Sequence, residues 1–129
     1  MKLLIDTHVA IWAISASHRL PPAILDILEN NQNVVHVSVA TIWEISIKYA
    51  KFGTPRMPFS GTDAVDRFTR SGFTLLPILP HHAAATETIV TDHADPFDRL
   101  LVAQAITEPL ALVTKDQKIA AYSPTFISW

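Results

Sequence analysis

The sequence predicts an α/β fold in which a central parallel sheet is covered on both faces by helices. Short apolar runs, typical of buried strands, alternate with longer segments whose apolar residues repeat at helical spacing. This alternation favours parallel strands joined by right-handed crossovers. The length of 129 residues, with 49% hydrophobic, suits one domain over residues 1–129.

The predicted strands are short runs rich in Val, Ile and Leu. Each is bounded by polar or turn-forming residues, which suits strands buried on both faces of a parallel sheet. Pro77 closes the third run, because proline cannot donate a hydrogen bond to a neighbouring strand. In order, the predicted strands are residues 2–5, 34–37, 73–76 and 110–113, followed by a short edge strand at 125–127.

Capping residues and prolines mark the ends of the predicted helices. Pro22 suits the first turn of the second helix, and Pro96 suits the first turn of the sixth, which Asp95 can cap. Ser38 can cap the third helix, which a glycine ends. The stretch 54–61 is predicted to be an exposed loop. In order, the predicted helices are residues 8–14, 23–29, 39–52, 62–71, 80–90, 96–107 and one or two turns within 115–122.

Charge and composition argue against several classes of protein. A formal net charge of −2 is unusual for proteins that hold long nucleic acids by phosphate neutralisation alone, although Lys48, Arg56 and Lys115 could help to hold a short one. No apolar run approaches the roughly 20 residues of a membrane span, and no signal-peptide pattern precedes Asp6. We therefore expect a cytoplasmic protein. Because cysteine is absent, a bound metal needs oxygen or imidazole ligands.

Four acidic residues stand at the ends of predicted strands or within predicted helices: Asp6, Glu44, Asp98 and Asp116. The carboxyl ends of parallel strands meet at one edge of a sheet, so these side chains could converge there. Two carboxylates about 4 Å apart repel by roughly 4 kcal/mol at an effective dielectric constant near 20. A cluster of them must therefore take up protons, spread apart or bind a cation. Oxygen ligands without cysteine suit Mg²⁺ or Mn²⁺.

Each acid also has an ordinary explanation. Asp6 could cap the helix that follows it, and Glu44 could pair with the lysine one helical turn later. Asp98 resembles the acidic third position of a capping box after Asp95, and Asp116 could be a turn residue. A shared site is favoured because acids from separate strand ends and a facing helix are expected at the same edge.

The same acids lie in four segments that carry a family resemblance. The segments are residues 4–8 (LIDTH), 38–45 (SVATIWEI), 95–105 (DPFDRLLVAQA) and 112–116 (LVTKD). Together they resemble the PIN-domain endoribonucleases, and specifically the VapC-like toxins of bacterial toxin–antitoxin pairs. The resemblance implies an α/β/α sandwich around a central parallel sheet.

The resemblance also implies a function. It places the family's acidic metal ligands on Asp6, Glu44, Asp98 and Asp116, with Mg²⁺ or Mn²⁺ as the cofactor. The implied reaction is metal-assisted hydrolysis of RNA phosphodiester bonds. The implied partners are an RNA substrate, a VapB-like antitoxin and a second copy of the chain as a homodimer. Supporting roles are expected for Thr7, Thr114 and Asp95.

Two other functions stay open. A metal-dependent phosphohydrolase could use an imidazole and carboxylate site built from His81, His82, His93 and Asp95, although their spacing matches no strong motif. A non-catalytic module could instead bind RNA or a protein through the same groove. Most of the large aromatic residues are expected in the core, and one or two of them could lie at an interface. These residues are Trp12, Trp43, Phe52, Phe59 and Phe68.

Overall fold

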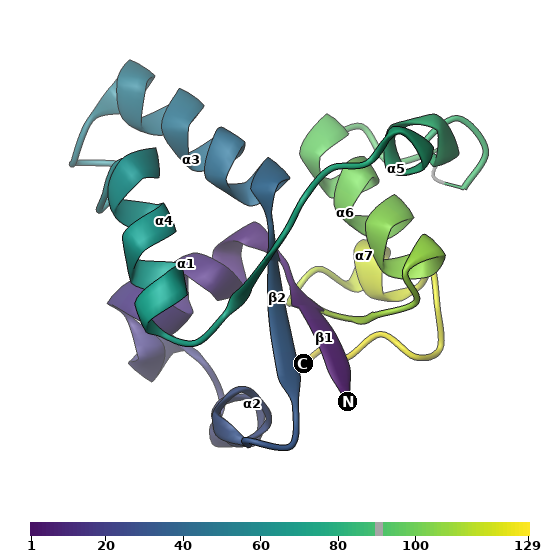
Figure 1. Ribbon diagram of the computed structural model, residues 1–129, viewed down its shortest axis with the longest axis horizontal. Helices are drawn as coiled ribbons and strands as arrows, with labels where there is room; N and C mark the ends of the chain where they lie inside the picture. Colours follow the sequence, from purple (N-terminus) through teal and green to yellow (C-terminus); the bar gives the residue numbers. More distant parts are fainter. Residues whose placement is uncertain (90–91) are drawn as a thin grey trace.

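The structure is a computed structural model that describes residues 1–89 and 92–129. Within these residues, four parallel strands form one sheet in the order β3-β2-β1-β4. Figure 1 shows helices on both sides of the sheet, so the predicted α/β/α class is confirmed. The strands are β1 (Lys2–Ile5), β2 (Val34–Ser38), β3 (Thr74–Leu76) and β4 (Ala111–Val113). The helices are α1 (Thr7–Ser15), the 3-10 turn η1 (Ser17–Arg19), α2 (Pro22–Glu29), α3 (Val39–Phe52), α4 (Gly61–Arg70), α5 (Pro80–Ala85), α6 (Pro96–Thr107) and α7 (Gln117–Ala120).

Strand β1 lies in the middle of the sheet and is the most deeply buried. It pairs with β2 on one side and with β4 on the other, with Ile5 opposite both Val37 and Val113. The side chains of Leu3, Leu4 and Ile5 are fully buried. Successive side chains of a strand point to opposite faces, so this run of apolar residues serves both layers of helices.

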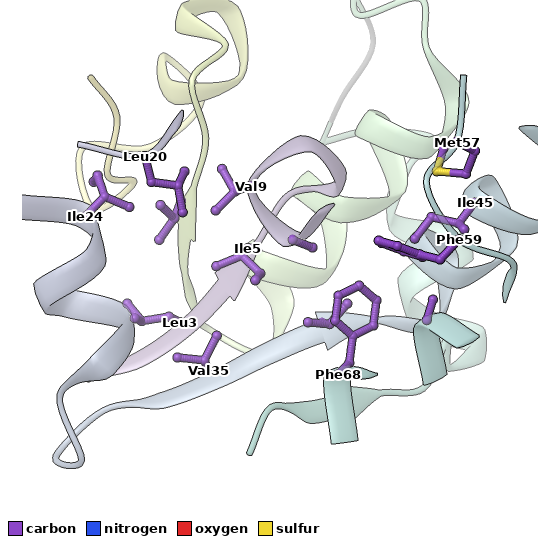
Figure 2. Packing of buried hydrophobic residues seen from close by; sticks show 14 residues of the cluster. Leu3, Ile5, Val9, Leu20, Ile24, Val35, Ile45, Met57, Phe59 and Phe68 are labelled. Carbon is purple, nitrogen blue, oxygen red and sulfur yellow. The ribbon is translucent and has the colours of Figure 1, made fainter. Parts of the chain in front are cut away.

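The core accordingly has a part on each face of the sheet. Leu3 and Ile5 pack in one cluster with Val9 of α1, Ile24 of α2 and Phe68 of α4, as Figure 2 shows. On the opposite face, the buried residues are Leu4, Leu112, Leu101 and Val102 of α6, and Ile119 of α7. Burying one such side chain stabilises the fold by about 1.5–3 kcal/mol.

Serine hydroxyls cap the first turns of α3 and α4. Ser38 ends β2, and its hydroxyl accepts a hydrogen bond from the backbone N–H of Ala40 at 3.0 Å. Ser60 does the same for Asp63 at the start of α4. Gly61 follows Ser60, and a Cβ atom there would lie 1.8 Å from the Ser46 hydroxyl of α3. The glycine therefore lets α4 approach α3 closely.

Two predicted elements differ in the structure, and the loop predicted over 54–61 buries Met57 and Phe59 in the core instead of lying wholly exposed. The helix predicted over 80–90 ends at Ala85, and residues 86–88 form tighter turns in which each N–H bonds three residues back. The Thr86 hydroxyl also bonds back to the Ala83 carbonyl, which competes with the helical pattern. Val90, the last residue of that prediction, lies outside the described residues.

The edge strand predicted over 125–127 is the second difference. In the described chain this segment contributes one bridge, between Val113 and Ile127. Pro124 has no N–H to donate, and the Ser123 hydroxyl accepts from the Thr125 N–H, so the backbone turns here before a ladder can extend. The prediction of a strand was therefore wrong, although one pairing contact to β4 exists.

The aromatic residues divide between core and surface. Phe59 and Phe68 are buried, and Trp12 is partly buried against the core. Trp43 on α3 is 57% exposed and Phe52 is 39% exposed. Among the described residues, no helix combines the length and the apolar character needed to cross a bilayer.

Candidate metal centre

The acidic side chains come from elements that end or begin at the carboxyl edge of the sheet. Asp6 follows β1 directly, and its N–H bonds to the carbonyl of Val113, the last residue of β4, at 3.1 Å. Asp116 lies a few residues beyond β4, at the start of α7. Asp98 lies in the first turn of α6, and Glu44 lies on α3, which begins where β2 ends.

Asp6 and Asp116 are joined through the hydroxyl of Thr114. This hydroxyl donates to Oδ2 of Asp6 at 2.5 Å and accepts the backbone N–H of Asp116 at 3.0 Å. The other oxygen of Asp6, Oδ1, caps α1 by accepting the N–H of Val9 at 2.9 Å. Asp6 and Thr114 are both buried, whereas Asp116 is exposed. The chain thus fixes Asp6 from both neighbouring elements.

Glu44 is held by a second set of hydrogen bonds. It is 4% exposed, and its Oε1 accepts the hydroxyl of Thr7 at 2.8 Å. Its Oε2 lies 2.7 Å from Nζ of Lys48. Because the Thr7 hydroxyl hydrogen points to Glu44, the 3.1 Å contact between Thr7 and Thr41 is best satisfied with Thr41 as the donor. Because Glu44 is buried, this pair differs from an ordinary surface ion pair, in which both charged groups are exposed to solvent.

Asp98 has a partner that sequence reasoning did not assign to it. Nε2 of His93 donates to Oδ2 of Asp98 at 3.0 Å. His93, Asp98 and Asp116 each offer a ligand atom, and these atoms lie within 4.8 Å of one another. Asp95 is exposed and caps α6 by accepting the N–H of Phe97 at 2.8 Å. The position of His93, five residues before Asp98, gave no helical or strand signal that could have revealed this contact.

The carboxylates of this edge repel one another. Burial raises the pKa of Asp6, against the hydrogen bonds from Thr114 and Val9, and the negative charge of Asp98 raises it further. Burial also raises the pKa of Asp98, to which the charges of Asp95 and Glu44 add. Asp6 and Glu44 stand outside the 4.8 Å group, but both interact with Asp98 through their charges. Oxygen donors whose charges destabilise one another fit a hard divalent cation.

A hollow opens beside the acids. It has a volume of about 380 Å³ and is lined by Asp6, His8, Trp12, Lys115 and Asp116. A larger hollow of about 530 Å³ lies among residues of α2 and Phe73, and none of the predicted acids lines it. The smaller hollow is therefore the one through which a substrate could reach Asp6 and Asp116.

The alternative histidine site does not form. His81 and His82 lie near Glu108, whereas His93 lies near Asp98, so the residues proposed for it are divided between separate places. His82 is fully buried, and its Nδ1 accepts the backbone N–H of Leu79 at 2.9 Å. Its Nε2 must then carry the proton, which it donates to Glu108 at 2.5 Å. This histidine has no free nitrogen to offer a metal.

The sequence also matches a known protein family over most of its length. Residues 3–123 match the family model described as the PIN domain. The chain belongs to the PIN domain family. This confirms the resemblance found in the sequence, and it means that the acidic edge lies within a PIN domain. The chain matches none of the curated proteins with which it was compared.

Solved structures share this PIN fold over nearly the whole chain. VapBC2 from Rickettsia felis, bound to a DNA fragment from its promoter, has a TM-score of 0.69 and 19% identity, covering 100% of this chain and 98% of that chain. A toxin–antitoxin complex from Klebsiella pneumoniae has a TM-score of 0.59 and 21% identity, covering 98% and 96%. VapC20 from Mycobacterium tuberculosis, a toxin that cleaves the sarcin–ricin loop, has a TM-score of 0.66 and 15% identity, covering 98% of each chain.

Proposed function

We propose that this chain is a metal-dependent endoribonuclease that hydrolyses RNA phosphodiester bonds, and that it is the toxin of a toxin–antitoxin pair. The observation that carries the proposal is the gathering of carboxylates at one edge of the sheet, where burial and mutual repulsion raise the pKa of Asp6 and of Asp98. Membership of the PIN domain family, a family of nucleases, supports it. The likeness in fold to an RNA-cleaving toxin also supports it.

In this proposal Asp6, Glu44, Asp98 and Asp116 hold Mg²⁺ or Mn²⁺. Bound there, the cation would neutralise charge on the scissile phosphate and make a water molecule more nucleophilic. The carboxylates supply oxygen ligands and negative charge, and Asp116, which is exposed, is the acid most open to the substrate.

Neighbouring side chains keep the carboxylates in position. Thr114 holds Oδ2 of Asp6, Thr7 holds Oε1 of Glu44, and His93 holds Oδ2 of Asp98. Lys48 compensates the charge of Glu44 from the solvent side, since its side chain is 43% exposed. Asp95 acts on the site through the start of α6, which it caps. Each contact restricts the side-chain rotamer of a ligand, as hydrogen bonds behind metal ligands do elsewhere.

The test is cleavage of RNA by charge-neutralised variants. Asp6→Asn and Asp98→Asn should abolish Mg²⁺-dependent cleavage of total RNA, while thermal unfolding shows a folded protein, because each change removes a charge that burial disfavours. Asp66→Asn, at an exposed aspartate of α4, is the matched control and should cleave normally. EDTA should stop the wild type.

Unchanged cleavage by both Asn variants would reject the site. A wild-type protein that binds RNA but never cuts it, with Mg²⁺ or Mn²⁺ present, would favour the non-catalytic alternative. The protein is also purified in the presence of chelator, and RNA cleavage is measured after each metal is added back in turn. This distinguishes an inactive protein from one that had only lost its cation.

The proposed partners are a VapB-like antitoxin and a second copy of the chain, acting together in the cytoplasm. The toxin–antitoxin complex and the promoter-bound VapBC2 that share the fold support this part of the proposal. Sedimentation of the purified chain at several concentrations tests self-association, and a strictly monomeric result would remove the homodimer. Loss of cleavage on addition of the antitoxin would identify that partner as an inhibitor.

A further inference from the structure

A second hollow adjoins the acidic one and shares part of its wall. It has a volume of about 420 Å³ and lies between α1 and the loop that follows α3. His8 and Trp12 line both hollows. An extended ligand lying in the acidic hollow could therefore continue over the rings of His8 and Trp12 into the second hollow.

The second hollow is cationic, although the protein is acidic overall. Arg19, Lys48 and Arg56 line it, and none of the described residues that line it is acidic. Lys48 is paired with Glu44. In the described part of the chain, neither Arg19 nor Arg56 forms an ion pair. Their charges are available to an anionic ligand, whereas the formal net charge of the whole chain is −2.

Trp12 has the surroundings of a stacking surface. The guanidinium of Arg19 lies 5.5 Å from the centre of its ring, and Nζ of Lys115 lies 5.8 Å from it. The ring of His8, one helical turn earlier, lies 5.8 Å away. Trp12 is partly buried against the core, so its ring is held in place before any ligand arrives. It lies on the helix that Asp6 caps, which fixes its distance from the carboxylates.

We propose that Trp12 stacks on an unpaired base of a single-stranded RNA whose scissile phosphate lies at the acidic edge, and that Arg19 and Arg56 contact the phosphates that follow. This inference rests on the proposed function and names how its substrate is held. An arriving base displaces the cationic side chains from the indole face, and those side chains turn to the phosphates. Alternating aromatic and cationic contacts are how proteins bind single strands without reading their sequence.

RNA fits this surface better than a protein segment does. The strand must pass the acidic hollow to be cut, and the two hollows meet at Trp12. The acidic edge repels the backbone of a strand, so the neighbouring cations supply the attraction that the site itself lacks. An antitoxin segment competing for the same cations is the other outcome that the experiment distinguishes.

The experiment measures binding without cleavage. A fluorescently labelled single-stranded RNA oligonucleotide is titrated with each variant in EDTA, and anisotropy gives Kd at several salt concentrations. Trp12→Leu should weaken binding by about fivefold or more, and Trp12→Phe should restore most of it, because stacking needs a ring rather than indole itself. Arg19→Ala and Arg56→Ala should each lower the slope of log K against log salt by about 0.7. Lys2→Ala, at the opposite end of β1, is the matched control and should change neither quantity.

The possible results distinguish failure of the proposed RNA-binding surface from failure of the proposed nuclease function. If the wild type cuts RNA with Mg²⁺ but Trp12→Leu, Arg19→Ala and Arg56→Ala all bind RNA as the wild type does, the inference is overturned. If these variants bind RNA normally and lose only antitoxin binding, the surface belongs to the protein partner and the inference is again overturned. If the wild type cuts no RNA under any metal, the proposed function fails, while the binding result still decides whether Trp12 holds RNA. Thermal unfolding of Trp12→Leu, compared with Trp12→Phe, shows whether weaker binding reflects a lost fold.

Discussion

At the scale of single residues, the two oxygens of Asp6 are held by different parts of the chain. Oδ1 starts α1 through Val9, and Oδ2 is fixed by Thr114, which lies 108 residues away in the sequence. The Thr114 hydroxyl also accepts the N–H of Asp116. One hydroxyl therefore links two of the proposed metal ligands, and its removal should disturb the positions of both Asp6 and Asp116.

Thr114→Val tests this link. Valine has nearly the same shape but cannot donate to Asp6 or accept from Asp116, so metal-dependent RNA cleavage should fall by about 10-fold to 100-fold while the fold is kept. Thr69→Val removes a hydroxyl that bonds only within α4 and serves as the control. Initial cleavage rates measured over a range of Mg²⁺ concentrations give the result. Equal rates for wild type and Thr114→Val would show that the hydroxyl does not support the site.

The residues that could be predicted from the sequence are those with a local signal. Asp6 was expected as a helix cap or as a ligand, and the structure shows that it does cap α1 while lying at the acidic edge. Glu44 likewise pairs with Lys48 as its spacing suggested. The local explanation and the shared site are therefore compatible. His93 was missed because its contact with Asp98 depends on how the chain folds before α6, which no local pattern encodes.

At the scale of secondary-structure elements, a buried histidine joins α5 to the end of α6. His82 donates to Glu108, and the exposed His81 also contacts the same carboxylate oxygen at 3.1 Å. These hydrogen bonds, first that of His82 and then that of His81, hold the pKa of Glu108 below its ordinary value of 4.5. The folded protein therefore favours ionised Glu108.

This shift predicts a dependence of stability on pH. A lowered pKa stabilises the fold fully above the ordinary value of 4.5, and the stabilisation is lost as the pH falls through the lower folded value. Glu108→Gln should remove it, so the difference in Tm between wild type and variant should be largest near neutral pH and shrink in acid. Glu87→Gln, at an exposed glutamate, is the control. A difference that does not change with pH would contradict the assignment.

The contact between α3 and α4 makes a second prediction at this scale. Gly61→Ala places Cβ against the Ser46 hydroxyl and should lower the free energy of unfolding by about 1–3 kcal/mol. Adding Ser46→Ala should recover part of the loss, since the nearest remaining Ser46 atom would be Cβ at 3.1 Å. Gly72→Ala is the matched comparison, because its cost comes from a φ of +81° in open space. Denaturant unfolding that shows rescue of Gly72→Ala by Ser46→Ala would contradict this explanation.

Element ends were predicted less well than element types. The strands and most helices follow from apolar spacing and capping residues, and Ser38, Asp95 and Pro96 mark real boundaries. The helix predicted over 80–90 ended early because Thr86 bonds back to the chain, and the strand at 125–127 was limited by the turn around Pro124. Both differences come from side-chain and backbone hydrogen bonds that apolar periodicity does not register.

At the scale of the whole molecule, cation binding should stabilise the fold. The carboxylates lie just after β1, on α3, on α6 and in the segment after β4, so a shared cation would connect distant parts of the chain. Mg²⁺ at 100 times its Kd should add about 2.7 kcal/mol to the free energy of unfolding. The effect should be absent in Asp98→Asn and should not be reproduced by NaCl at equal ionic strength. Thermal unfolding at increasing Mg²⁺ measures it, and an equal rise in the variant would indicate binding elsewhere.

The sequence predicted that the strands would be parallel but not their order. The alternation of strands and helices is enough to predict parallel strands. The order β3-β2-β1-β4 depends in addition on which crossover packs on which face of the sheet. The sequence therefore predicted that acidic side chains would gather at this edge of the sheet. It did not predict which of them would lie closest together, such as Asp98 and Asp116 with His93.

The central position of β1 has a consequence for synthesis on the ribosome. Lys2–Ile5 is synthesised well before its partner β4 and the proposed ligand Asp116, because both lie much later in the sequence. A nascent chain in which Thr114 has not yet left the ribosome lacks the hydroxyl that fixes Asp6, and its acidic edge is therefore incomplete. If the proposed function holds, translation itself would delay RNA cleavage until the residues up to Asp116 have left the ribosome, and an antitoxin synthesised alongside would have time to fold first.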